Sequence, residues 1–366
     1  MDSKNGKNGK NGKIKIGILG MGGIAEAHVP FMIKNERAEL LAICDSDEAW
    51  LASEKARLGV KYAYADYNEL LKNEEIDAVI VCLPNCLHAD ATVASLNAGK
   101  HVLCQKPMAC TAAEAGAMCA AMEKAGKKLM ISHNQRFEAP IRLMKKLNDE
   151  GRFGDVYVMR IGWQRPLGIM PSPFSNRPDG SVYNRNWFNE KGMGGGVLRD
   201  LGTHLLDLAL YITGFPELES ASASLYRKFY PDMEENELSN YVFDSEDLAL
   251  GHIKFKNGLS MQIEVSFGSM IEDHKIITEL YGDKGGASRK PDGIALINRT
   301  GDIISTEYVK QFRFPVTEPN EAFLDAVIND TEPFVTAYEG KKVIEILDAM
   351  YASSGRIIKE IVGGHI

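Results

Sequence analysis

Hydrophobic and polar positions divide the chain into two parts with different periods. From residue 14 to residue 131, short apolar runs alternate with amphipathic segments, which predicts strands alternating with helices. The predicted strands are 14–19, 39–44, 62–65, 78–82, 101–104 and 128–131, and the predicted helices are 23–35, 47–58, 67–72, 88–98 and 111–125. This alternation predicts a doubly wound α/β domain built on a parallel sheet.

From about Phe153 the segments become longer and their period is two residues, as in antiparallel strands. These strands are expected at 155–164, 218–229, 243–256, 259–267 and 275–281, with a helix at 196–213 among them. The pattern predicts a second α/β domain with a large, open, mainly antiparallel sheet. Helices expected at 319–329 and 337–361 either cover that sheet or return to the first domain.

These patterns divide the chain into a tail at 1–13, a first domain at 14–134 and a second domain at 135–366. The tail repeats Lys-Asn-Gly three times and is expected to be disordered. A net charge of -8 argues against binding to nucleic acid or to an anionic membrane surface. The sequence shows no signal peptide and no apolar run of membrane-span length, so a cytoplasmic protein is expected.

All six cysteines lie in the first third of the chain, mostly in apolar segments, which favours buried thiols in a reducing compartment. Cys82, Cys86 and His88 could be considered as a metal site. However, Cys82 ends an apolar strand and no second ligand pair follows at zinc-like spacing. We therefore expect no metal.

A glycine-rich turn follows the first predicted strand. Gly20, Gly22 and Ala25 form a G-x-G-x-x-A pattern between a strand and a helix. The first glycine allows the tight turn, the second lets the backbone approach a pyrophosphate, and the small alanine permits close packing of helix on strand. The pattern predicts a dinucleotide site, and Gly23 and Ile24 open the helix that would face the phosphates.

The second predicted strand ends at Asp45, close to the expected position of a ribose-binding acid. Its carboxylate would accept hydrogen bonds from the ribose hydroxyls of NAD and repel the additional phosphate of NADP. No arginine directly follows it, since residues 46–48 are Ser, Asp and Glu. We therefore predict NAD as the cofactor.

Asp200 and His204 stand four residues apart, just after the glycine run 194–196. They share one face of the predicted helix with Asp207 and Tyr211. A histidine next to a carboxylate can act as a general base. Lys106 follows a strand end and precedes Pro107, which restricts its backbone, so its ammonium could stabilise negative charge on a substrate oxygen.

Taken in order, these motifs resemble the Gfo/Idh/MocA oxidoreductases over nearly the whole chain. The shared marks are the glycine-rich turn, Pro84-Asn85-x-x-His88, Lys106-Pro107, Asn134-x-Arg136-Phe137, and the glycine run followed by Asp200-x-x-x-His204. The resemblance implies a Rossmann domain, a second domain whose sheet often mediates homo-oligomers, and sugar or cyclitol substrates. It also implies that Lys106, Asp200 and His204 are catalytic.

The cofactor is expected to contact Gly20, Gly22, Gly23, Ile24, Asp45, Pro84, Asn85, His88, Gln105 and Lys106. Gln105 stands where the family commonly has glutamate. Loss of that negative charge should disfavour the charged form of the lysine, so Gln105→Glu is expected to move the lysine limb of the pH–rate profile upward.

For the substrate, aromatic faces next to arginine suit a sugar ring and its hydroxyls. The expected contacts are Arg136, Trp163, Arg165, Tyr183 and Trp187, together with Asp200 and His204. The long loop 165–195 is expected to be a substrate lid or an oligomer arm.

The sequence therefore predicts NAD-dependent oxidation of a secondary ring hydroxyl of a sugar, glycoside or cyclitol, with glucoside C3 favoured. Three alternatives remain open: an inositol dehydrogenase, a glycoside hydrolase that uses NAD in a transient oxidation, and a nucleotide-binding regulator without turnover.

Overall fold

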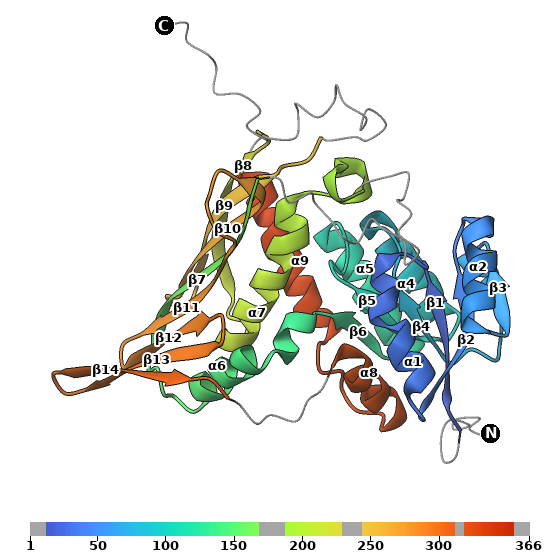
Figure 1. Cartoon of the computed structure of the whole chain (residues 1–366), viewed down its shortest axis with the longest axis horizontal. Coiled ribbons are helices and arrows are strands. Elements are labelled where there is room, and N and C mark those ends of the chain that lie inside the picture. The colour runs from blue at the N-terminus through green and yellow to red at the C-terminus, as the bar shows by residue number, and fades with distance from the viewer. Residues whose placement is uncertain (1–11, 168–186, 229–243, 312–317, 355–366) are drawn as a thin grey trace, which may run out of the picture.

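The computed structural model describes residues 12–167, 187–228, 244–311 and 318–354. It contains two sheets, each in its own part of the molecule, with helices packed between them (Figure 1). Among the described residues, no helix has the length and apolar character needed to cross a membrane. The repeats of the N-terminal tail and most of loop 165–195 lie outside the described ranges.

The first sheet is parallel and has the strand order β3-β2-β1-β4-β5-β6. Its strands are β1 (Ile14–Leu19), β2 (Ala38–Cys44), β3 (Tyr62–Tyr64), β4 (Ala78–Val81), β5 (His101–Gln105) and β6 (Leu129–Ser132). This confirms the predicted doubly wound sheet. The strand order reverses between β1 and β4, which is where ligands bind in open α/β sheets.

Its helices are α1 (Val29–Lys34), α2 (Glu48–Leu58), α3 (Tyr67–Leu71), α4 (His88–Asn97) and α5 (Ala112–Ala125). The continuous helix predicted at 23–35 was wrong, because a 3₁₀ helix, Gly23–Ala27, ends before α1 begins. Pro30 has no N–H to bond the carbonyl of residue 26, but it is tolerated in the first turn of α1.

The second sheet has the strand order β14-β13-β12-β11-β7-β10-β9-β8, and only the β7–β10 pair is parallel. Its strands are β7 (Val156–Pro166), β8 (Leu218–Tyr226), β9 (Leu248–Phe255), β10 (Ser260–Ser269), β11 (Lys275–Gly282), β12 (Gly285–Lys290), β13 (Gly293–Thr300) and β14 (Ile303–Val309). The mainly antiparallel sheet is confirmed. Strands β12 to β14 were not predicted, because β12 begins with two glycines and β14 is exposed almost throughout.

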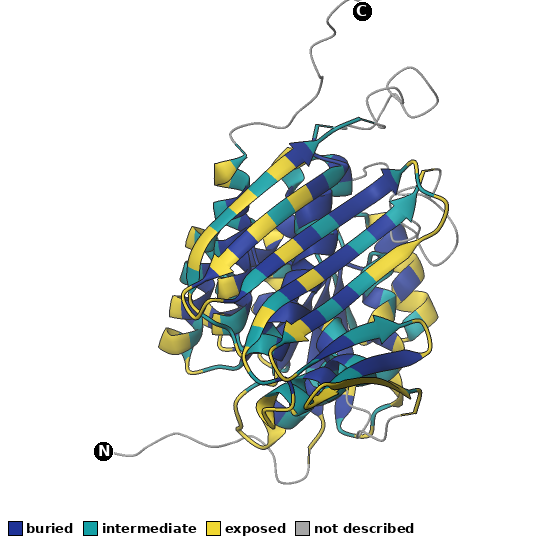
Figure 2. Cartoon of the chain, turned by 90° about the vertical axis from the view of Figure 1, so that its left-hand side faces the viewer, coloured by how far each residue is buried: buried dark blue, intermediate teal, exposed yellow. Residues whose placement is uncertain are grey.

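Helices α6 (Ala139–Asp149), α7 (Thr203–Thr213) and α9 (Ala337–Ser353) lie on the side of this sheet that faces the first domain (Figure 1). No helix of the described residues covers the other face, and exposed and buried residues alternate along its strands (Figure 2). Helix α6 was not predicted, although Ile141 and Met144 form its buried side.

The C-terminal helices resolve the alternative left open by the sequence. Helix α8 (Pro319–Ile328) returns to the first domain, where Arg37 pairs with Glu321 and Asp325. Helix α9 contacts α5 of the first domain as well as α7 and β8 of the second. The last described part of the chain therefore joins the two domains.

Candidate active site

A cavity of about 300 Å³ opens where the two parts of the molecule meet. Predicted site residues that line it are Gly22, Gly23, Ile24, Asn85, His88, Gln105, Lys106, Trp163, Arg165, Asp200 and His204. Gly20, Asp45, Pro84 and Arg136 do not line it. The structure thus brings together predicted residues from Gly22 to His204, which are 182 positions apart in the chain.

Lys106 and Asp200 form an ion pair in this cavity. Lys106 follows β5 and is joined to Pro107 by a cis peptide bond. Its Nζ lies 2.5 Å from Asp200 Oδ1, and both side chains are 14% exposed. A charge-assisted bond of this kind fixes the ammonium at the cavity surface, where it can still donate to a ligand.

Asp200 belongs to a π-helical turn, Leu198–Gly202, which precedes α7. Such wide turns are frequent at functional sites because they redirect a side chain. The buried Glu246 stabilises this turn, because its Oε1 accepts a hydrogen bond from Leu198 N at 3.1 Å. Gly196 has φ +115°, and a Cβ there would lie 2.3 Å from Glu246 Oε1. The glycine run therefore allows Glu246 to approach the turn.

His204 lies one helical turn after Asp200, on α7. Its ring packs against Trp163, with centroids 6.0 Å apart. Its Nδ1 is buried and has no hydrogen-bond partner among the described residues. Burial, aided by Lys106, holds the pKa of His204 well below its ordinary value. The imidazole is therefore neutral near pH 7 and able to accept a proton.

The glycine-rich turn has the shape that a dinucleotide requires. Gly20 has φ +89°, and a Cβ there would lie 2.5 Å from the Cys82 carbonyl oxygen. The backbone of Gly22 and Gly23 borders the cavity without side-chain atoms. Asp45 Oδ2 accepts from Met21 N at 2.9 Å, which places the carboxylate beside this turn. These features fit a dinucleotide, with Asp45 next to the glycines.

Two residues that were expected to contact the cofactor have side chains at hydrogen-bond distance from backbone carbonyl groups. His88 is buried, and its ring nitrogens lie 2.7 Å from the Pro107 carbonyl oxygen and 2.8 Å from that of Leu83. Asn85 Nδ2 donates to the Gly194 carbonyl oxygen at 2.9 Å. His88 therefore fixes the loop that carries Lys106, and Asn85 ties the first domain to the glycine run.

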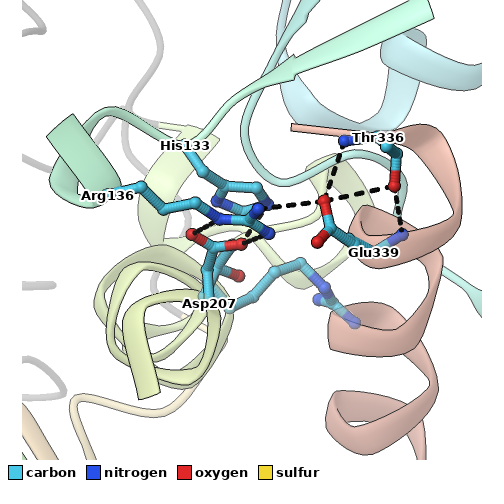
Figure 3. A network of polar contacts seen from close by, with 7 residues as sticks. His133, Arg136, Asp207, Thr336 and Glu339 are labelled. Atoms are coloured by element: carbon cyan, nitrogen blue, oxygen red, sulfur yellow. Dashed lines mark hydrogen bonds and ion pairs between the residues drawn. The ribbon is translucent and has the colours of Figure 1, made fainter. Parts of the chain in front are cut away.

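Arg136 was predicted to bind substrate, and the structure corrects this. Its side chain is fully buried and makes two bonds to Asp207, of 2.8 and 2.6 Å (Figure 3). A third bond, of 2.9 Å, reaches Glu339, which also caps α9 through Thr336. A guanidinium with these partners joins α7, which carries His204, to α9.

His133 lies beside this network (Figure 3). Its Nε2 is 3.6 Å from Asp207 Oδ1, and neither ring nitrogen has a hydrogen-bond partner among the described residues. Burial lowers the pKa of His133 to about 4. Asp207 thus belongs to a buried network, although the sequence placed it on the same helix face as Asp200 and His204.

The aromatic region that the sequence indicated is partly in place. Trp163 lines the cavity and donates from Nε1 to His274 Nε2 at 2.7 Å. The Arg165 guanidinium lies 5.3 Å from the Trp163 ring centroid. Tyr183 and the side chain of Trp187 lie outside the described residues.

Several lining residues were not predicted, among them His28, Ser132, Phe188, Phe267, Glu318 and Asn320. Most carry no motif. The proline of Glu318-Pro319-Asn320 marks the start of a helix, but nothing in the sequence placed that helix beside the glycine-rich turn. Within the described ranges, no group of three or more His, Cys, Asp or Glu side chains could hold a metal ion.

Family profiles match both parts of the chain. The oxidoreductase family with an NAD-binding Rossmann fold (GFO_IDH_MocA) matches residues 14–133, and the C-terminal α/β domain of this family matches residues 145–359.

Similarity to named dehydrogenases covers nearly the whole chain. D-glucoside 3-dehydrogenase of Escherichia coli (strain K12) is 28% identical over 95% of this chain and 93% of its own. Myo-inositol 2-dehydrogenase of Thermotoga maritima is 28% identical over 90% and 93%. The fold is similar to that of levoglucosan dehydrogenase in complex with NADH, with a TM-score of 0.78, 22% identity, and coverage of 94% and 97%.

Proposed function

The chain belongs to the Gfo/Idh/MocA oxidoreductase family, and on this basis we propose that it oxidises a secondary ring hydroxyl of a sugar, glycoside or cyclitol. One observation carries the proposal: Lys106 from the NAD-binding domain and Asp200 and His204 from the second domain meet in one cavity. Because a binding module without turnover would not need this set, the geometry favours an enzyme.

The glycine-rich turn and Asp45 would hold NAD, which would supply the hydride acceptor when bound. The neutral His204 takes the proton of the substrate hydroxyl while the C–H bond gives up its hydride, which leaves a carbonyl. Lys106 donates to the oxygen as negative charge develops on it. Asp200 keeps the lysine in place through the 2.5 Å bond.

Within this class we propose a glucoside oxidised at C3 as the substrate. The support is the Trp163 face beside His204, with Arg165 stacked over it, because an aromatic surface packs on the C–H face of a pyranose and can extend to an aglycone. The Escherichia coli relative is named for this reaction. An inositol dehydrogenase remains a second candidate, because the Thermotoga maritima relative carries that name.

The test is NADH formation against a panel of free sugars, inositols and glycosides, with His204→Ala as the blank and mass spectrometry of the products. Stoichiometric NADH with a keto-glucoside is the expected result. NADH formed only with inositols would favour the second candidate. A released aglycone without net NADH would indicate the hydrolase, and cofactor binding without any product would contradict an enzyme.

We further propose that the open face of the second sheet joins copies of this chain. Strand register puts Leu250 and Ile277 in one row across the sheet, and Tyr281 lies four residues after Ile277 on the same face; Leu250 is 39% and Tyr281 36% exposed. Exposed apolar side chains that gather on one surface commonly mark a protein interface. Light scattering should give a multiple of the 40.4 kDa chain mass, and Leu250→Glu should lower it. A monomeric wild type would contradict this arrangement.

We also propose a cytoplasmic location. All six cysteines are free thiols, and four of them are buried, which suits a reducing compartment. Cell fractionation with an antibody to the native protein tests it.

A further inference from the structure

Four buried polar side chains form a continuous hydrogen-bonded row along one side of the cavity. Ser132 Oγ lies 3.3 Å from Gln105 Nε2, which lies 2.5 Å from His28 Nε2, and His28 Nδ1 lies 2.6 Å from Asn320 Oδ1. All four residues line the cavity and are at most 6% exposed. They come from β6, β5, the start of α1 and the start of α8, so the row spans both ends of the chain.

The donor and acceptor of each hydrogen bond in the row can be assigned by starting from Asn320. Asn320 Nδ2 donates to the Ala27 carbonyl oxygen at 3.3 Å, so Asn320 Oδ1 is the atom that accepts from His28 Nδ1. Burial lowers the pKa of His28, so the ring is neutral and carries one N–H, at Nδ1. His28 Nε2 is therefore an acceptor, and the Gln105 amide must offer it an N–H.

The amide of Gln105 is thereby fixed in one orientation. Its nitrogen is used by His28 and Ser132, and its Oε1 has no donor among the described residues. An amide oxygen that a bound ligand covers without offering it a donor loses its hydrogen bonds to water, which is unfavourable. The oxygen is therefore available to a ligand that brings an N–H or O–H group.

We propose that Gln105 Oε1 accepts a hydrogen bond from the carboxamide N–H of the nicotinamide ring of NAD, and that His28 and Asn320 are positioning residues that hold the Gln105 amide for it. Gln105 lines the cavity next to Lys106, which the proposed function places at the substrate oxygen. The phosphates can be excluded as partners because they carry only acceptors. The carboxamide offers the required donor.

The first experiment compares the dissociation constants of NAD and 3-acetylpyridine adenine dinucleotide, which has a methyl group in place of the amide. Gln105→Met should weaken NAD binding about five- to tenfold, as expected for one hydrogen bond, and change binding of the analogue less than about twofold. Gln164→Met, at another buried glutamine that does not line the cavity, is the matched control. Equal weakening of both cofactors, or no weakening, would overturn the proposal.

Gln105→Glu keeps an acceptor at this position and should retain the preference for NAD over the analogue, even if Gln105→Met does not fold. Asn320→Leu removes the acceptor of His28 Nδ1–H and should reduce that preference while Gln105 itself is unchanged. Nitrogen NMR of histidine-labelled wild-type protein should show His28 protonated at Nδ1. Protonation at Nε2 instead would overturn the proposal.

Discussion

Lys106 Nζ and Asp200 Oδ1 lie 2.5 Å apart, although 94 residues separate them in the sequence. The bond joins a loop of the NAD-binding domain to the π-helical turn of the second domain. It also places the positive charge of the lysine within range of His204, where it contributes to the lowered pKa of that ring. In the proposed mechanism the pair therefore affects both the substrate oxygen and the base His204.

We expect Lys106→Met and Asp200→Asn each to lower kcat/KM at least about a hundredfold, because each removes part of the group that stabilises the developing charge. The double variant should lose much less than the product of the two effects, because both changes disrupt one pair. Steady-state kinetics of the four proteins would measure this. Fully multiplicative losses would show that the residues act independently.

Arg136→Met should lower the free energy of unfolding by about 3–5 kcal/mol, because it leaves the buried Asp207 without its partner. Arg136→Met combined with Asp207→Leu should recover much of this loss. The control is Lys146→Met, which breaks an exposed pair with Glu150 and should cost less than about 1 kcal/mol. Urea denaturation provides the measurement. A single variant as stable as the wild type would contradict the role assigned to Arg136.

Asp45→Asn should raise the ratio of kcat/KM with NADP to that with NAD by about tenfold or more, because the carboxylate charge that repels the 2′-phosphate is gone. Asparagine keeps one oxygen to accept from the backbone of the glycine-rich turn. Glu48→Gln, an exposed charge removed three residues later, is the control. An unchanged ratio would show that selection against NADP comes from another part of the site.

His133 should make stability depend on pH. The folded pKa of about 4 lies below the ordinary value of 6.5, so between these values the unfolded chain binds a proton that the folded chain does not. Stability is therefore complete above pH 6.5 and falls as the pH decreases, by up to about 1.4 kcal/mol per pH unit from this residue. His133→Leu should reduce the slope by that amount, measured by urea denaturation with His252→Leu as the control. An identical slope would assign the dependence to other groups.

The sequence was most informative where a motif and an element end coincide. Lys106 after β5, and Asp200 and His204 at a four-residue spacing across the π-helical turn and the start of α7, were predicted and do meet in the cavity. Motifs did not distinguish a side chain that faces a ligand from one that holds the backbone. Arg136 therefore looked like a ligand contact, whereas it bonds the carboxylates of Asp207 and Glu339. His88 lines the cavity, but its ring nitrogens lie at hydrogen-bond distance from backbone carbonyl groups.

Other features depend on contacts between distant segments, which local patterns do not encode. The approach of Asn320 to His28 joins positions 292 residues apart. Strand β14 pairs through its backbone while its side chains stay exposed, so it has no alternation to detect. Helix α6 did carry a signal, the buried pair Ile141 and Met144 at i and i+3, which could have been used.

The bond between Arg136 and Glu339 also bears on the order in which the molecule is completed during synthesis. A nascent chain that has emerged as far as residue 330 already contains Lys106, Asp200 and His204, but it lacks the carboxylate that completes the surroundings of Arg136. The helix that carries His204 therefore gains its contacts with α9 only when α9 has left the ribosome. The proposed catalytic groups are synthesised early, and the helix that supports them is synthesised late.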